Sequence, residues 1–280
     1  MSLHFTKVQS CGNDFIILDE ANGPVNIEPP LARALCLRNR GVGADGLIAV
    51  AAEGPARARV SFYNADGSRA EMCGNGLRCA AHYLRWRHGA AEKLALATDA
   101  GTRSCQVLGE PWRTTVEVCA DMGVVEMAGT LAEAWRDQRI EIDGAIVASH
   151  AIRVGNPHLV LLRPPDAAEV ARLGPELSHH PALPGGVNVE WVELVAGKAR
   201  AAVYERGVGP TLACGSGACA VTAALIAAQQ WLPGVTLAVE LAGGRLAVTV
   251  DADWRARLQG ASTVIFDGAL VAPPGALAPA

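Results

Sequence analysis

Two short stretches of this sequence place a cysteine where a helix is expected to begin. One is 213–220, Ala-Cys-Gly-Ser-Gly-Ala-Cys-Ala, and the other is 72–80, Met-Cys-Gly-Asn-Gly-Leu-Arg-Cys-Ala. In both, a Gly-polar-Gly run follows the first cysteine. Free backbone N–H groups and the positive end of the helix dipole gather at such a turn, so the pattern favours a bound anion and a thiolate at Cys73 and Cys214.

The two stretches belong to a longer internal repeat. Tyr63 lies ten residues before Cys73, and Tyr204 lies ten residues before Cys214. Further upstream, Gly-Asn pairs at 12–13 and 155–156 precede the two cysteines by 61 and 59 residues, counted from each glycine. This agreement predicts an ancient duplication, with two halves of about 140 residues each.

Composition excludes several classes of partner. The chain has 280 residues, 50% of them hydrophobic, and a formal net charge of −4 without a long basic block, so neither nucleic acid nor an anionic membrane is indicated as a partner. Eight cysteines without a secretory pattern over residues 1–20 predict a cytoplasmic protein with reduced thiols. The most apolar stretch, 218–228, is too short to span a membrane and suits a buried helix.

Short strands alternate with one central apolar helix in each half. Helices are expected from Pro29 to before Gly41, from the Cys73 turn to about His88, over 167–174, and after the Cys214 turn. The intervening segments are expected to form strands, including 146–154 and 262–266. The pattern predicts an α+β domain built twice, with the functional site at the seam between the halves.

Two matched thiols at one anion site suit acid–base chemistry at a carbon that carries a carboxylate. One thiolate removes a proton while the other thiol delivers one to the opposite face. A cysteine hydrolase with His158 as its base would leave the second cysteine unexplained. A zinc site is disfavoured by the C-x5-C and C-x4-C spacings, and the other helix cysteines, Cys79 and Cys219, are expected to be buried packing residues.

Several polar residues fall in loops at equivalent ends of the two halves. They are Asn13, Asn64, Asn156 and Asn188. Each alone is an ordinary turn residue, and their convergence is what indicates binding. Arg206, eight residues before Cys214, could be a surface ion pair, but its planar fork suits a second carboxylate.

The chain resembles the diaminopimelate epimerases over nearly its whole length. The matching blocks are Gly12-Asn13-Asp14-Phe15, Gly41 to Gly46, Asn64-Ala65-Asp66-Gly67-Ser68, Cys73-Gly74-Asn75-Gly76-x-Arg78-Cys79, Gly155-Asn156-Pro157-His158, Asn188, Tyr204-Glu205-Arg206-Gly207, and Ala213 to Ala220. Together these blocks are specific, whereas either cysteine turn alone would also fit the wider group that includes proline racemases.

The resemblance implies a cofactor-independent, metal-free isomerase that interconverts LL- and meso-diaminopimelate in lysine and peptidoglycan precursor biosynthesis. Cys73 and Cys214 would be its acid and base. The reacting carboxylate would lie on the backbone of Gly74-Asn75 and Gly215-Ser216, and His158 and Glu205 would tune the thiols. The rest of the substrate would be bound by Asn13, Asn64, Asn156, Asn188, Glu205 and Arg206.

The same resemblance implies the architecture. Two pseudo-symmetric domains would each wrap a highly curved, mostly antiparallel sheet around a central helix, with the active site in the cleft between them. The N-terminal half would comprise 1–118 plus 264–280, the C-terminal half 119–263, and two chains would form a homodimer.

Two features keep other interpretations open. Gln9-Ser10-Cys11 and Pro210 depart from the family pattern, which leaves room for an altered substrate. The alternatives are therefore a two-cysteine racemase or epimerase of a different amino acid, and a non-catalytic amino-acid binding protein in which the two cysteines only pack.

Overall fold

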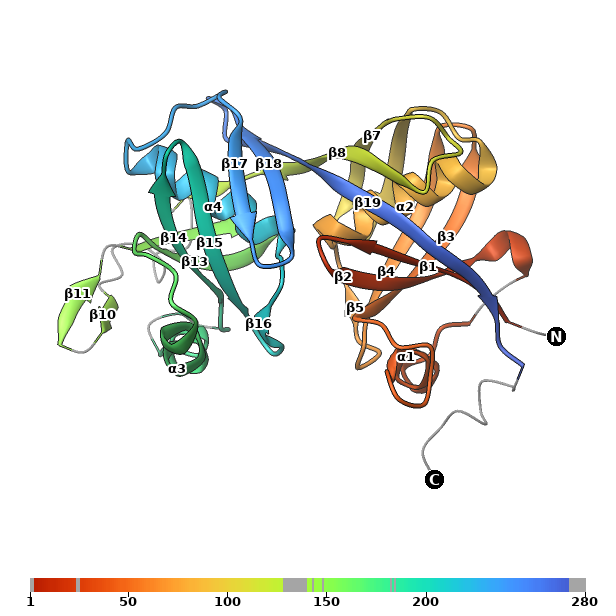
Figure 1. Cartoon of the computed structure of the whole chain (residues 1–280), viewed down its shortest axis with the longest axis horizontal. Helices are drawn as coiled ribbons and strands as arrows, with labels where there is room; N and C mark the ends of the chain where they lie inside the picture. Colours follow the sequence, from red (N-terminus) through yellow and green to blue (C-terminus); the bar gives the residue numbers. More distant parts are fainter. Residues whose placement is uncertain are drawn as a thin grey trace. The chain divides into compact units, whose positions relative to one another are not determined.

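The computed structural model describes residues 3–23, 26–127, 140–142, 144–147, 149–181, 183 and 185–271. The chain divides into two compact units (Figure 1). Unit 1 comprises residues 1–120 and 260–280, and unit 2 comprises residues 121–259. None of the helices in the described ranges combines the length and apolar character needed to cross a membrane.

Unit 1 begins with a strand hairpin and ends on the last strand of the chain. Its elements are β1 (His4–Ser10), β2 (Asn13–Asp19), the 3-10 helix η1 (Glu20–Asn22), α1 (Pro29–Cys36), β3 (Gly46–Gly54), β4 (Arg57–Asn64), β5 (Arg69–Ala70), α2 (Gly74–His88), β6 (Lys93–Thr98), β7 (Gly101–Leu108), most of β8 (Thr115–Val124), and most of β19 (Arg255–Ala269).

Unit 2 repeats this order after a short additional segment. Its elements are β9 (Glu126–Met127), β10 (Ile140–Ile142), β11 (Ala145–Val147), β12 (Ser149–Val154), β13 (Asn156–Leu161), α3 (Ala167–Ser178), β14 (Asn188–Val195), β15 (Lys198–Glu205), β16 (Gly209–Thr211), α4 (Gly215–Ala227), β17 (Leu237–Leu241) and β18 (Gly244–Val250).

Strand pairing follows the same order in both units. In unit 1, β1–β2, β3–β4, β4–β5, β6–β7 and β7–β8 are antiparallel, while β2–β3 and β4–β6 are parallel. In unit 2, the corresponding antiparallel pairs are β12–β13, β14–β15, β15–β16, β17–β18 and β18–β19, and the parallel pairs are β13–β14 and β15–β17. The predicted duplication and mostly antiparallel α+β fold are thereby confirmed.

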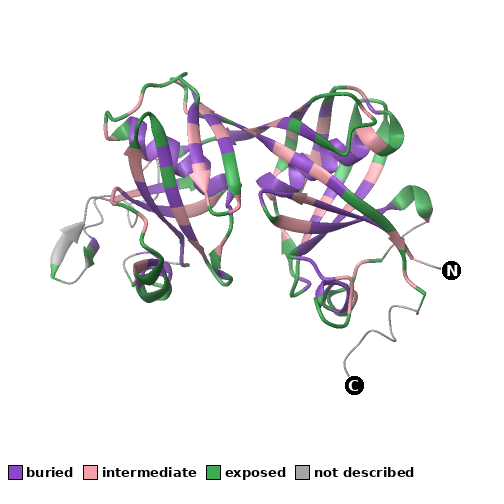
Figure 2. Ribbon diagram, in the orientation of Figure 1, coloured by how far each residue is buried: buried purple, intermediate pink, exposed green. Residues whose placement is uncertain are grey.

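One helix in each unit lies inside its sheet. α2 packs against β1, β2, β3, β6 and β7, and α4 packs against β12, β13, β14, β15, β17 and β18. Figure 2 shows both helices largely in the colour of buried residues, and every residue from Gly215 to Ile226 is buried. Because α4 is apolar on all sides, it must be enclosed, which explains why the strands of unit 2 wrap around it.

The structure corrects three element boundaries. Residues 146–154 do not form one strand, because β11 pairs with β10 whereas β12 pairs with β13 and β9. α3 continues to Ser178, past Gly174 and Pro175. β19 has 15 residues instead of the five expected over 262–266.

Candidate active site

Cys73 is the N-cap residue of α2. Its backbone is extended, with φ −137° and ψ 116°, and its Sγ accepts a hydrogen bond from the Gly76 N–H at 3.4 Å. A side chain at position 76 would not fit, because a Cβ there would lie 2.7 Å from the ring of Phe62. The glycine at position 76 therefore lets the first turn of α2 pack against the ring of Phe62.

Cys214 is the N-cap residue of α4 and has the same geometry. Its φ and ψ are −118° and 119°, and its Sγ accepts from the Gly217 N–H at 3.4 Å. Ser216 Oγ also lies 3.4 Å from the sulfur. A Cβ at position 217 would lie 2.6 Å from Glu190 Oε1, so a carboxylate is packed directly against this turn.

The surroundings of Cys214 favour the neutral thiol. Its side chain is 7% exposed, and burial together with the charges of Glu205 and Glu190 raises its pKa well above 9.0, against smaller opposing effects of hydrogen bonds from Ser216 and Gly217. Burial also raises the pKa of Glu205, although Thr211 Oγ1 donates to its Oε1 at 2.5 Å. Cys214 therefore keeps its proton near neutral pH, which corrects the thiolate that its helix N-terminus alone would favour.

His158 lies beside this cysteine turn on strand β13. The residue is fully buried, and its Nδ1 donates to Glu190 Oε1 at 2.7 Å, since a carboxylate can only accept. Its Nε2 lies 3.0 Å from Asn156 Oδ1. The parallel pairing of β13 with β14 places His158 opposite Asn188, which brings three of the predicted residues of unit 2 together.

Sequence reasoning missed Glu190, which orients the His158 ring. Its side chain is buried, and no described residue bonds its Oε2. A signal was present in the sequence: Glu190 interrupts the apolar strand at 189–192 and lies two residues after Asn188, on the same face of β14. An acidic residue at a buried strand position requires a partner, and here that partner is a predicted site residue.

Asn188 and Arg206 form a second pair within unit 2. Asn188 Oδ1 accepts from the backbone N–H of Arg206 at 2.9 Å. The Arg206 side chain is exposed, and its NH1 donates to the carbonyl oxygens of Gly185 and Gly186 at 2.7 and 3.1 Å. These bonds hold the guanidinium by one edge.

In unit 1, the structure joins Asn13 to Asn75 but not to Asn64. Asn75 Nδ2 donates to Asn13 Oδ1 at 3.2 Å, and Asn13 Nδ2 donates to Asp45 Oδ2 at 2.9 Å. The Asn64 side chain instead donates to Ser68 Oγ at 2.9 Å, within its own turn. The Asn64 side chain therefore stabilises its own turn, which is the ordinary role of an asparagine in a turn.

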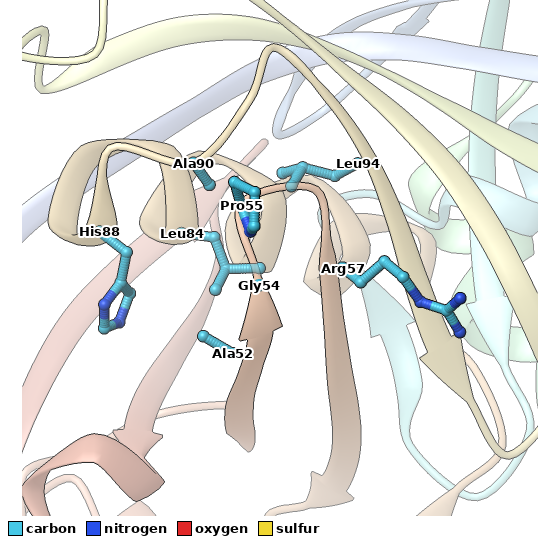
Figure 3. A pocket seen from close by; sticks show the side chains of 8 residues that line it. All are labelled: Ala52, Gly54, Pro55, Arg57, Leu84, His88, Ala90 and Leu94. Atoms are coloured by element: carbon cyan, nitrogen blue, oxygen red, sulfur yellow. The ribbon is translucent and has the colours of Figure 1, made fainter.

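A pocket of about 330 Å³ in unit 1 lies away from the Cys73 turn. Its lining includes Leu84, His88 and Ala90 at the C-terminal end of α2, together with residues of β3, β4 and β6 (Figure 3). Because α2 has 15 residues, its two ends are roughly 22 Å apart. The pocket contains no residue of the predicted site. In the described part of the chain, no cluster of three or more His, Cys, Asp or Glu side chains could hold a metal ion.

The buried thiols of Cys36 and Cys79 make the stability of the folded chain depend on pH. Burial raises the pKa of Cys36 from 9.0 to about 11 and that of Cys79 from 9.0 to about 12. The unfolded chain ionises these thiols from pH 9 upward while the folded chain does not, so their contribution to stability is complete below pH 9 and is lost as pH rises toward 11–12.

Between pH 8 and pH 11, the Tm of a Cys36→Ala/Cys79→Ala variant should fall less than the Tm of the parent. At pH 8 the variant should melt earlier, because it has two cavities. As pH rises, the difference in Tm should narrow by at least about 3 °C, measured by circular dichroism. A difference in Tm that stays constant across this range would contradict the assignment of these thiols as buried titrating groups.

Comparison with known proteins agrees with this geometry. A family model described as diaminopimelate epimerase matches residues 5–128 and 150–264. The diaminopimelate epimerase of Azotobacter vinelandii (strain DJ / ATCC BAA-1303) is 37% identical over 281 residues, which cover 96% of this chain and 99% of the relative. That of Magnetococcus marinus is 36% identical over 283 residues, covering 98% and 99%.

Solved structures share the fold at low sequence identity. A predicted epimerase from Pseudomonas aeruginosa has a TM-score of 0.71 at 18% identity, covering 96% of this chain and 99% of that one. A hydroxyproline epimerase from Agrobacterium vitis, with trans-4-hydroxy-L-proline bound, has a TM-score of 0.72 at 14% identity, covering 96% and 91%.

Proposed function

This chain belongs to the diaminopimelate epimerase family, and we propose that it interconverts LL- and meso-2,6-diaminopimelate through Cys73 and Cys214. The observation that carries the proposal is the pair of cysteine N-caps, each with a glycine N–H on its sulfur. One thiolate removes the α-proton and the other thiol delivers a proton to the opposite face, which inverts the centre.

The helix termini supply the electrostatic part of the mechanism. The reacting carboxylate is bound by the backbone N–H groups of Gly74-Asn75 and Gly215-Ser216. Negative charge develops on this carboxylate as the α-proton leaves, and N–H groups at the positive end of a helix stabilise that charge without reorganisation. His158 and Glu205 tune the thiols, and the rest of the substrate is bound by Asn13, Asn64, Asn156, Asn188, Glu205 and Arg206.

The proposal extends to the organisation of the protein. We take the two epimerase halves to be residues 1–118 with 264–280 and residues 119–263, bounds that differ by two to four residues from those of the two compact units. The protein acts as a homodimer in the cytoplasm. Ile265 and Phe266 support a partner surface, because these large apolar side chains on β19 are 49% and 47% exposed. The eight free cysteines fit a reducing compartment.

Hydrogen exchange at the α-carbon tests the function directly. In D₂O with a thiol reductant, and without added pyridoxal phosphate or metal, we expect the protein to replace the α-proton of diaminopimelate by deuterium, measured by ¹H NMR. Exchange should accompany the appearance of the other stereoisomer, measured by chiral chromatography. Exchange of another amino acid, with none for diaminopimelate, would move the assignment to a different racemase; exchange of no amino acid would favour a binding protein.

A further inference from the structure

A fully buried arginine follows the first cysteine turn. Arg78 lies five residues after Cys73, and its side chain has no exposed surface. Its Nε and NH2 donate to Ser10 Oγ at 3.2 and 2.7 Å, its NH1 to the Gly74 carbonyl at 3.2 Å, and its NH2 to Asn75 Oδ1 at 2.7 Å. All of these acceptors are neutral, so the positive charge has no carboxylate among its hydrogen-bond partners. A buried charge of this kind is costly unless something else requires it.

These hydrogen bonds give the neighbouring amides a single orientation. A guanidinium only donates, so the oxygen of Asn75 must face Arg78 and its nitrogen must face Asn13. Asn13 then accepts through Oδ1 and donates through Nδ2 to Asp45, whose carboxylate only accepts. A cation at one end and an anion at the other therefore fix both amides, because reversing either amide would break two bonds.

The orientation determines what Asn13 offers to a ligand. One lone pair of its Oδ1 is occupied by Asn75, and one Nδ2 hydrogen is occupied by Asp45. The second Nδ2 hydrogen bonds no residue in the described ranges. Asn13 therefore offers a ligand one Nδ2 hydrogen and the second lone pair of its Oδ1, and the Nδ2 donor suits a carboxylate.

The turn at Cys214 is surrounded by acidic side chains, whereas the turn at Cys73 is followed by a cation. The residue five positions after its cap is Cys219, where the first turn has Arg78. The charged or titratable side chains around Cys214 are Glu205 and Glu190, with His158 bonded to Glu190. The duplicated backbone thus places one cysteine cap near a buried cation and the other near two carboxylates, of which Glu190 is buried and Glu205 is half-buried.

We propose that Arg78 is a positioning residue of the Cys73 half of the site, which orients the Asn75 and Asn13 amides and attracts the anionic end of the substrate with its charge. The substrate part of this statement rests on the proposed function. The electrostatic part belongs to the turn itself and can be measured without any turnover of diaminopimelate.

Alkylation of the two cysteines by a charged and a neutral reagent provides this measurement. Rates with iodoacetate and iodoacetamide are followed separately at Cys73 and Cys214 by peptide mass spectrometry of the full-length reduced protein. The ratio of the iodoacetate rate to the iodoacetamide rate should be higher at Cys73 than at Cys214. Arg78→Met should lower the ratio at Cys73 by about three- to tenfold, the effect of one charge about a helical turn away, and leave the ratio at Cys214 unchanged.

The second cysteine is the internal control of each sample. A purely structural role of Arg78 would change both reagents together at Cys73 and leave the ratio as it was, and that result would overturn the proposal. Arg78→Lys keeps the charge but cannot reach three acceptors at once, so its ratio should fall less than that of Arg78→Met. If Arg78→Met does not fold, Arg78→Gln takes its place, because it also removes the charge but keeps an N–H donor, and an unchanged ratio at Cys73 in that variant overturns the proposal equally. Absence of α-proton exchange in the parent would refute the proposed function without changing these ratios.

Discussion

Replacing Cys214 by alanine is expected to lower the rate of epimerisation by about 10²- to 10⁴-fold, the usual contribution of a positioned acid or base. The variant should nevertheless retain one partial reaction. Cys73 can still remove the α-proton from the face it contacts and return a deuteron from solvent to the same face. One of the two stereoisomers should therefore exchange its α-proton in D₂O without inversion.

Cys73→Ala should behave as the mirror image. It should lose epimerisation to a similar extent and exchange only the other stereoisomer. The measurement is ¹H NMR of the α-proton, started separately from LL- and meso-diaminopimelate, with chiral chromatography of the product. If both variants exchanged the same stereoisomer, or if either epimerised within about tenfold of the parent rate, the two-base assignment would be wrong.

Two cysteines in the same helices serve as matched controls. Cys79 and Cys219 lie six and five residues after the cap positions and are fully buried. Alanine at either position removes a thiol from the same helix without touching the first turn. These variants should lose stability through the cavity they leave but keep an epimerisation rate close to that of the parent.

The parts of the fold that local chemistry decides could be predicted from the sequence. Cys73 and Cys214 stand before Gly-polar-Gly and an apolar run, and both proved to be N-caps with their sulfurs on glycine N–H groups. Pro29 begins α1, as expected for a residue that lacks the N–H that a first helical turn leaves unpaired. The repeat spacing indicated the duplication that the pairing order then confirmed.

The parts that depend on distant contacts could not be predicted in the same way. β19 contains Gly260 just before the predicted strand 262–266, yet it remains extended because β18 pairs with its first part and β1 with its last. α3 passes through Gly174, where a Cβ would lie 2.2 Å from the ring of Tyr204. The glycine that suggested a helix end is required by this close packing.

The site shows the same division. His158 was identified from its motif, but the carboxylate that orients it comes from Glu190, 32 residues away. Arg78 was visible as a motif residue, but its role depends on Ser10, which is 68 residues away and one of the departures from the family pattern. The sequence motifs include His158 and Arg78, whereas the hydrogen-bond partners of these two residues could be identified only from the folded structure.

Selectivity for diaminopimelate over simpler amino acids is expected to depend on Arg206. Backbone amides hold the reacting carboxylate and do not distinguish side chains, so selectivity must come from groups at the other end of the substrate. Arg206 is held by NH1 on the carbonyls of Gly185 and Gly186. No residue in the described ranges is bonded to its Nε or NH2, and that edge can grip a distal carboxylate through two parallel hydrogen bonds.

Arg206→Met should therefore lower kcat/KM for diaminopimelate by about thirty- to several-thousand-fold, which corresponds to roughly 2 to 5 kcal/mol of transition-state binding. Arg206→Lys should recover only part of this loss, because an ammonium group cannot reproduce the planar fork. The measurement is steady-state epimerisation by chiral chromatography, together with iodoacetamide labelling of Cys73 and Cys214 to verify that both turns are intact.

Arg200→Met is the matched control for this change. Arg200 lies on β15, the strand that leads to Arg206, and its exposed side chain pairs with Glu193 on β14. A surface ion pair of this kind contributes about 0–1 kcal/mol to stability. Because Arg200 is not one of the proposed site residues, kcat/KM of Arg200→Met should stay near the parent value. If Arg206→Met were as active as Arg200→Met, then Arg206 would serve only to close the loop at Gly185 and Gly186, and the distal carboxylate would have to be recognised by the asparagines instead.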